Sequence, residues 1–193
     1  MITWIVLGVV AVVGLYLVVT YNGFVAMTQR AKEAWADIDV QLKRRYDLIP
    51  NLVETVKGYA SHERETLDAV TAARAAATST HIDAGNITPA QITAMAGAEG
   101  ALGGALGKLL AVAEAYPDLK ANSNFAQLQS ELSDTENKIQ AARRFYNGNI
   151  RDLTTGLQSF PGNIVGSLFK FTAMPYFELP ENSVEREPVK VSF

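Results

Sequence analysis

The stretch AWADIDVQLKRRYDLIPNLVETVKGY, residues 34–59, contains the features that decide the fold. Apolar residues recur in it at steps of three and four, which is the pattern of an amphipathic helix; they are Trp35, Ile38, Leu42 and Ile49. Asp47 is a residue type that caps helix N-termini, and Pro50 is well tolerated in the first turn of a helix. The stretch therefore predicts a first helix that ends near Tyr46 and a second helix that begins two residues later, with a sharp corner between them.

This predicted corner also holds the densest cluster of charged and aromatic side chains in the chain. Such a cluster serves either as a structural corner between packed helices or as a patch that faces a partner. The pattern does not separate the two readings. The residues concerned are Lys43, Arg44, Arg45, Tyr46, Asp47, Pro50 and Asn51.

Length and composition describe a helical protein that buries one core. The chain has 193 residues, of which 48% are hydrophobic, so it can build the core of a single domain. Its net charge of −3 offers no basic excess for holding a polyanion, so we expect no nucleic-acid partner. It contains no cysteine, which excludes disulfides, thiolate metal ligands and a cysteine nucleophile.

The N-terminal region predicts a membrane anchor. Residues 1–29 carry no charged side chain, and residues 2–19 are almost wholly apolar. As a helix this run is about 27 Å long, close to the ~30 Å hydrocarbon core of a bilayer. A cleaved signal peptide is the alternative, but there is neither a basic region before the run nor an Ala-x-Ala-like site after it. Arg30 and Lys32 follow the span closely, and the positive-inside rule then places the C-terminal domain in the cytoplasm.

The rest of the chain predicts an all-α fold. Residues 48–78 form the second helix, and Thr88, Pro89 and Gln91 begin a third with a capping box. Glycines at positions 97–107 make that helix either closely packed or locally soft. A fourth helix keeps a 3,4 repeat from Phe125 to Phe160 and ends at Pro161.

We therefore expect an N-terminal transmembrane helix that continues into a long antiparallel four-helix bundle with an irregular C-terminal tail. The boundaries are 1–22 for the anchor, 23–160 for the bundle and 161–193 for the aromatic and acidic tail, with a short strand-like piece at 188–193.

Four charged residues fall on apolar stripes, and isolated burial of any of them would be costly. They form either a polar layer inside the bundle or a solvated boundary of it, and on the first reading Glu63 and Arg74 each meet an opposite charge from another helix. The four are Arg45, Glu63, Arg74 and Glu99.

The sequence contains no complete catalytic motif among those considered below. His62 and Glu63 resemble the start of H-E-x-x-H, but Thr66 stands where the second histidine is needed. The glycines at 97–107 are followed by Lys108 without the Ser or Thr of a phosphate-binding loop. We expect no catalytic, cofactor-binding or metal-binding residues and no cofactor; a hydrolase that uses His62 and Glu63 is the remaining enzymatic alternative.

The chain resembles the LemA family of bacterial membrane-anchored helical proteins, and the resemblance covers nearly its whole length. The similar segments are YNGFV (21–25), DVQLKRRYDLIPNLVETVKGYASHE (39–63), TLDAVTAAR (66–74), YPDLKANSNFAQLQSELSDTENKIQAARRFYN (116–147), FPGNIVG (160–166) and YFE (176–178).

This resemblance implies an N-terminal transmembrane helix and an antiparallel helical bundle at the bacterial cytoplasmic (inner) membrane, with no established catalytic residues. One branch of the family works in magnetosome membranes, so the resemblance leaves a specialised membrane role open. We expect a non-enzymatic scaffold or adaptor that binds protein partners of unknown identity or assembles as a homo-oligomer. The alternative is a membrane-surface-binding or membrane-remodelling module that uses Lys43, Arg44 and Arg45 together with aromatic residues of the tail.

Overall fold

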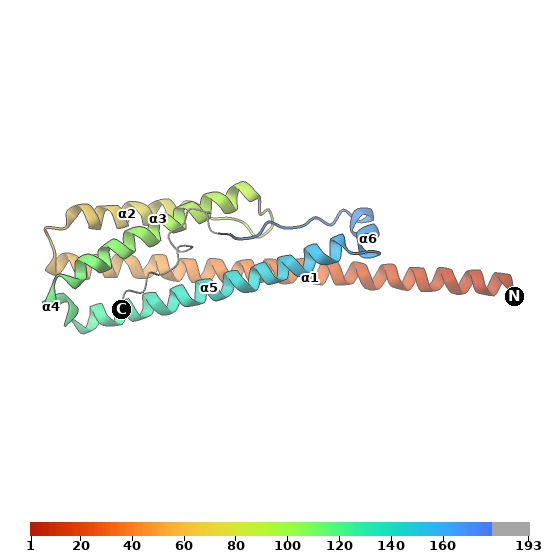
Figure 1. The fold of residues 1–193 in the computed structure, drawn as a ribbon, viewed down its shortest axis with the longest axis horizontal. Coiled ribbons are helices and arrows are strands. Elements are labelled where there is room, and N and C mark those ends of the chain that lie inside the picture. Colours follow the sequence, from red (N-terminus) through yellow and green to blue (C-terminus); the bar gives the residue numbers. More distant parts are fainter. Residues whose placement is uncertain (179–193) are drawn as a thin grey trace, which may run out of the picture.

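The longest element of the protein is a single helix that begins at its N-terminus. The computed structural model describes residues 1–178, and in it α1 (Ile2–Tyr59) has 58 residues. Such a helix is about 87 Å long. Its most apolar 18-residue window is not buried at all, and by length and composition this part is able to cross a membrane. Figure 1 shows the N-terminal third of α1 projecting from one end of the bundle.

The remaining helices fold back along the C-terminal part of α1. α5 runs antiparallel to α1 and packs along it, α2 packs along α3, and a contact between α1 and α2 joins the two pairs (Figure 1). The all-α fold with an apolar N-terminal helix is therefore confirmed. A closed four-helix bundle is not, because α3 and α5 do not approach each other closely along their lengths. The elements are α2 (Arg64–Thr78), α3 (Pro89–Glu114), α4 (Pro117–Lys120), α5 (Ser123–Gln158) and α6 (Gly162–Leu168).

The expected corner at Asp47 is wrong. α1 passes through Pro50 without a break and ends at Tyr59, and the chain turns at residues 60–63 instead. Proline has no N–H, so the carbonyl of Tyr46, four residues earlier, loses its helical partner. Arg74 of α2 supplies the replacement, because its Nε donates to Tyr46 O at 2.7 Å. This side chain from another helix allows the proline to stay in a continuous helix.

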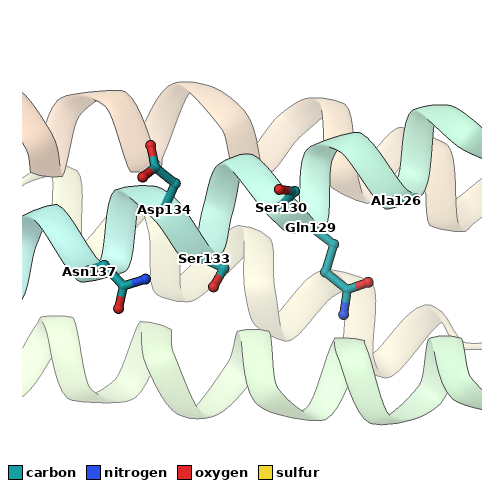
Figure 2. Close-up of a pocket in the computed structure, with 6 residues that line it drawn as sticks. All are labelled: Ala126, Gln129, Ser130, Ser133, Asp134 and Asn137. Atoms are coloured by element: carbon teal, nitrogen blue, oxygen red, sulfur yellow. The ribbon is translucent and has the colours of Figure 1, made fainter.

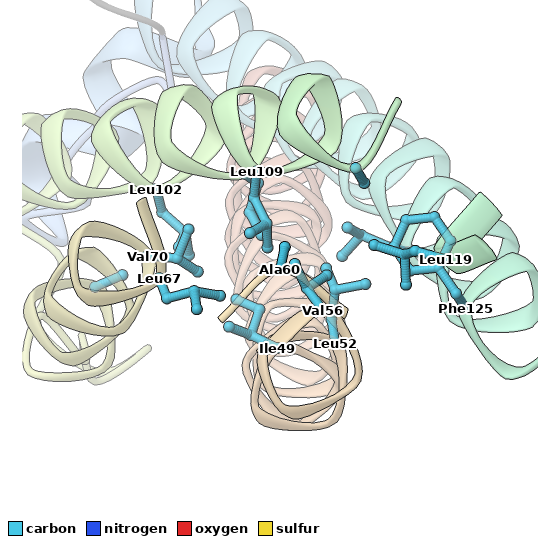
Figure 3. Close-up of a cluster of buried hydrophobic side chains, with 14 residues drawn as sticks. Ile49, Leu52, Val56, Ala60, Leu67, Val70, Leu102, Leu109, Leu119 and Phe125 are labelled. Carbon is cyan, nitrogen blue, oxygen red and sulfur yellow. The ribbon is translucent and has the colours of Figure 1, made fainter. Parts of the chain in front are cut away.

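The core is divided into three clusters along the α1–α5 axis. At the end far from the span, Leu52 and Val56 of α1 face Leu109 of α3 and Phe125 of α5 (Figure 3). The middle cluster is built on Trp35, which is 2% exposed. The cluster nearest the span is small and surrounds Phe24. Each long helix thus buries one apolar stripe, as the 3,4 periodicity predicts.

The predicted start of the third helix is confirmed. The Thr88 side chain accepts a hydrogen bond from the backbone N–H of Gln91, and the Gln91 side chain accepts one from the N–H of Thr88. Close helix packing does not explain four of its glycines. A Cβ added at Gly97, Gly100, Gly104 or Gly107 would meet nothing within 4 Å.

Glycine is required elsewhere, around Phe24. A Cβ at Gly156 would lie 2.9 Å from the Phe24 ring, and one at Gly162 would lie 2.6 Å from the carbonyl oxygen of Gly156. Gly166 is similarly close to the Leu157 side chain, at 2.8 Å. These glycines let α6 fold tightly against the end of α5 and the side of α1.

The tail is more ordered than expected. α6 lies in the region predicted to be irregular, and the segment after it returns over the bundle. Phe177 is 3% exposed, and its backbone N–H and carbonyl both bond the side-chain amide of Asn147, at 2.8 and 3.0 Å. The strand-like piece predicted at 188–193 lies outside the described residues. The division of the chain at residues 22 and 160 stays a prediction.

We expect alanine substitution to have opposite effects at two glycines. Gly162→Ala forces a Cβ against backbone and should cost about 1–3 kcal/mol of unfolding free energy. Gly104→Ala adds a methyl group to open space in a helix interior and should stabilise by up to about 1 kcal/mol. Urea unfolding of the detergent-solubilised chain, followed by circular dichroism, measures both. Equal effects at the two positions would contradict this assignment.

Candidate functional site

A buried guanidinium lies where α1, α3 and α5 meet. Arg45 is 4% exposed, although it falls in a stretch rich in exposed charges. It forms an ion pair with Glu99 of α3, and its Nη1 lies 2.7 Å from Oε2 of Glu136 on α5. Three helices thus contribute one charged group each to a single polar layer.

Tyr46 completes this layer from the next position of α1. Its hydroxyl donates a hydrogen bond to Oε1 of Glu99. Burial raises the pKa of Tyr46 above its ordinary value; the charge of Asp39 adds to this, and the charge of Arg45 opposes it. The phenol therefore stays neutral and able to donate at physiological pH. Glu99 receives both a charge partner and a hydroxyl donor, which is what a buried carboxylate requires.

The two carboxylates differ in their access to water. The Glu99 side chain is 9% exposed, whereas that of Glu136 is 36% exposed. Solvent screens Glu136, so we assign the stronger coupling to the Arg45–Glu99 pair. Breaking a buried pair by removing one partner is costly because it leaves an uncompensated charge. The layer therefore penalises any slip of α3 relative to α1.

The other two members of the predicted polar layer have neutral partners. Arg74 bonds the Tyr46 carbonyl, and Glu63 accepts a hydrogen bond from the Tyr116 hydroxyl at 3.2 Å. Within residues 1–178 neither forms an ion pair, so the expectation that both meet an opposite charge is wrong. Arg45 and Glu99 come together as a layer, and Arg74 adjoins it through Tyr46. Glu63 belongs to the turn beyond the end of α1 instead.

Sequence reasoning missed Glu136. It adjoins Thr135, which lies on the fourth-helix stripe, and is itself one position off that stripe. A carboxylate at a position flanking the stripe, with an arginine on the facing helix, is the signal that would have found it.

The remaining residues of the predicted corner lie on the outer surface of α1. Lys43, Arg44, Asp47, Pro50 and Asn51 are exposed, and they follow one another along the helix. The charge of Arg44 acts on Asp134 of α5, which pairs with Lys138 at 2.7 Å. The hydrogen bond from Lys138 holds the pKa of the Asp134 carboxyl below its usual range, and the charges of Lys138 and Arg44 add to this.

A shallow depression of about 520 Å³ lies on the exposed side of α5. Figure 2 shows Gln129, Ser133 and Asn137 projecting from the helix on the side where α3 runs. All the lining side chains come from this one helix and all are exposed, so the depression offers hydrogen bonds but no enclosure. Its lining is Ala126, Gln129, Ser130, Ser133, Asp134 and Asn137.

The fold and the polar layer define a class of protein: an elongated helical bundle attached to an apolar N-terminal helix able to span a membrane. The sequence comparison then gives the family. The model of the LemA family matches residues 34–193, and the chain belongs to that family.

Similar bacterial proteins place the chain in a membrane context. Magnetosome protein MamQ of Magnetospirillum gryphiswaldense is 25% identical over 182 residues, covering 83% of this chain and 65% of that protein. Magnetosome protein MamQ 2 of Paramagnetospirillum magneticum is 26% identical over 90% of this chain and 70% of its own length. Protein LemA of Metamycoplasma hominis is 27% identical over 78% of this chain and 64% of that protein. The chain thus spans about two thirds of the length of these relatives. It is a membrane-associated protein of the LemA family.

We expect Arg45→Met to cost about 3–5 kcal/mol of unfolding free energy, because it leaves the Glu99 carboxylate buried without a charge partner. Arg45→Met combined with Glu99→Met should recover most of this loss. Lys138→Met, which breaks the exposed pair with Asp134, is the matched control and should cost about 0–1 kcal/mol. Urea unfolding measures all three. A double variant no more stable than Arg45→Met would contradict the pairing.

We also expect Arg74 and Pro50 to be energetically coupled. Arg74→Met leaves the Tyr46 carbonyl without a donor and should cost about 1–3 kcal/mol. In a Pro50→Ala background the new N–H of residue 50 can bond that carbonyl, so the same change should cost clearly less. A double-mutant cycle on unfolding free energies gives the coupling. Strict additivity would show that Arg74 does not replace the missing helical hydrogen bond.

Proposed function

We propose that this chain is a non-enzymatic, membrane-anchored helical scaffold or adaptor. Its bundle binds protein partners, or further copies of itself, at the bacterial cytoplasmic membrane. The observation that carries the proposal is the continuity of α1. One helix runs from the apolar segment to the far end of the bundle, with no loop between anchor and domain.

A scaffold needs a surface held at a fixed height above the membrane. From residue 20 to Tyr59, α1 extends about 60 Å beyond the apolar run. Along most of this length α5 packs against it, and the Arg45 layer fixes the register of α3. Such an arrangement presents its outer side chains in one orientation, which lowers the ordering cost when a partner binds.

The partner-facing surface that we propose is the outer side of α1 between Val40 and Asn51. Val40 is 60% exposed, and Lys43, Arg44 and Asp47 follow it along the helix. Charges of both signs on this surface would select a partner by charge complementarity. The depression on α5 adds hydrogen-bonding groups on a neighbouring face.

We place this domain in the cytoplasm, because Arg30 and Lys32 are the first charged side chains that follow the apolar run. The relatives' names supply no catalytic activity to transfer, and two of them name the magnetosome.

The alternative role, lipid binding through Lys43, Arg44 and Arg45, has less support. Arg45 is buried in its ion pairs and is not available to a headgroup. Lys43 lies about 36 Å along the helix beyond residue 19, too far to touch the membrane that α1 enters if the helix stands upright.

Native mass spectrometry of the full chain, extracted from native membranes in mild detergent, tests the scaffold proposal. We expect a reproducible complex, either with a second protein or with further copies of the chain. The double variant Lys43→Glu with Arg44→Glu should lose the complex, because it reverses the charge of the proposed surface.

The matched control is Lys108→Glu, which reverses an exposed charge on α3 and should leave the complex unchanged. A wild-type chain recovered only as a monomer would refute the proposal. Equal loss of the complex in the control and in the double variant would refute the choice of surface.

A further inference from the structure

Two long uncharged segments meet at the end of the bundle nearest the apolar run. Residues 1–29 carry no charged side chain, and residues 153–177 carry one, Lys170. The first segment is the N-terminal half of α1. The second consists of the end of α5, then α6, then the segment 169–177 that follows α6. Figure 1 shows α6 at the end of the bundle from which α1 projects. The fold thus brings together a nearly charge-free zone from parts of the chain more than a hundred residues apart in sequence.

α6 is apolar on two sides. Its inner side consists of Gly162, Val165 and Gly166, which are buried against Phe24 and the end of α5. On its outer side Ile164 is 56% exposed and Leu168 is 63% exposed, one helical turn apart. A helix that is apolar on opposite sides is usually buried or in contact with lipid. Among residues 1–178, other parts of the chain cover only the inner side.

Aromatic residues on either side of α6 extend this exposed apolar surface. Phe160 is 80% exposed and Phe169 is 47% exposed. Together with Ile164 and Leu168 they form what we call the α6 cap.

The height of the α6 cap is fixed relative to the apolar run. Phe169 contacts Tyr21 of α1 edge-on, with ring centroids 4.8 Å apart, and Phe171 contacts the same ring at 5.5 Å. The cluster around Phe24 also includes Leu17, which belongs to the apolar run itself. A bilayer that covers residues 2–19 therefore reaches the level of the cap.

We propose that the α6 cap is a lipid-contacting element that inserts Phe160, Ile164, Leu168 and Phe169 into the interfacial region of the membrane that α1 enters. The exposed apolar surface of α1 continues into that of the cap through Tyr21, so the occupant that covers one also covers the other. The proposal rests on membrane insertion of α1 and is independent of which partner the bundle binds.

The position of Lys170 also agrees with contact between the α6 cap and the membrane interface. Lys170 lies two residues after the last residue of α6 with φ of 57°, in the left-handed region where glycine is usual, and the backbone N–H of Phe171 bonds the carbonyl of Gly166 at 2.9 Å. A lysine at the edge of an apolar zone can extend its ammonium to lipid phosphates while its methylene groups stay in the apolar region.

Site-specific fluorescence quenching tests the proposal, and the lack of native cysteine makes single labelling direct. The full chain, carrying Ile164→Cys or Leu168→Cys with a thiol-reactive fluorophore, is reconstituted into phosphatidylcholine and phosphatidylglycerol vesicles. The vesicles contain lipid with a nitroxide on its acyl chain near the headgroup. We expect quenching several-fold stronger than for the same label at Val40→Cys. Val40 is a matched control, since it is 60% exposed on a helix outside the cap.

A label at Val9→Cys, measured with a nitroxide placed deep on the acyl chain, reports on the anchor because residue 9 lies near the middle of the apolar run. Quenching at residue 9 without quenching at 164 and 168 would overturn the lipid contact while leaving the anchor intact. Absence of quenching at residue 9 would overturn the anchor and the lipid contact together.

Hydroxyl-radical footprinting of the unlabelled chain in the same vesicles avoids any effect of substitution. Phe160 is more exposed than Phe145, 80% against 59%, so in water it should oxidise at least as fast. Lipid contact should make oxidation of Phe160 several-fold slower than that of Phe145. Equal or faster oxidation would overturn the proposal. Slow oxidation without lipid quenching at 164 and 168 would also overturn it, because another copy of the chain would then cover the cap.

Discussion

The buried charge of Arg45 is the constraint on which the arrangement of the long helices depends. A guanidinium removed from water must be neutralised nearby, and its two carboxylate partners come from α3 and α5. The apolar stripes alone tolerate sliding, because leucine and isoleucine pack against many similar neighbours. The ion pair between Arg45 and Glu99 allows only one position of α3 along α1, so it prevents this sliding. The core clusters on either side of the layer can then pack in a single register.

A backbone hydrogen bond that α1 lacks at Pro50 is replaced next to the Arg45 layer. Pro50 deprives the Tyr46 carbonyl of its helical partner, and Arg74 from α2 supplies a donor. Tyr46 at the same time donates its hydroxyl to Glu99. Backbone and side chain of one residue therefore connect α1 to α2 and to α3.

Local patterns predicted most of the helical content, and non-local contacts account for the errors. The apolar run, the capping box at Thr88 and the long 3,4 repeat depend on neighbours within a few residues, so they could be read directly. The helix break at Asp47 was wrong because the cost of Pro50 is offset by a residue 24 positions later in the chain. α6 was missed because its glycines are unfavourable in an isolated helix. They become necessary only when the end of α5 lies against them.

Because α1 is unbroken, a change in the tilt of its apolar segment moves the whole bundle. Transmembrane helices tilt by about 20° on average, and the tilt changes with bilayer thickness. With no hinge after the apolar run, such a tilt would carry the far end of the bundle sideways by about 20 Å, given the ~60 Å length of helix beyond the membrane. Changes in lipid thickness would thereby become lateral displacements of whatever is bound at the tip.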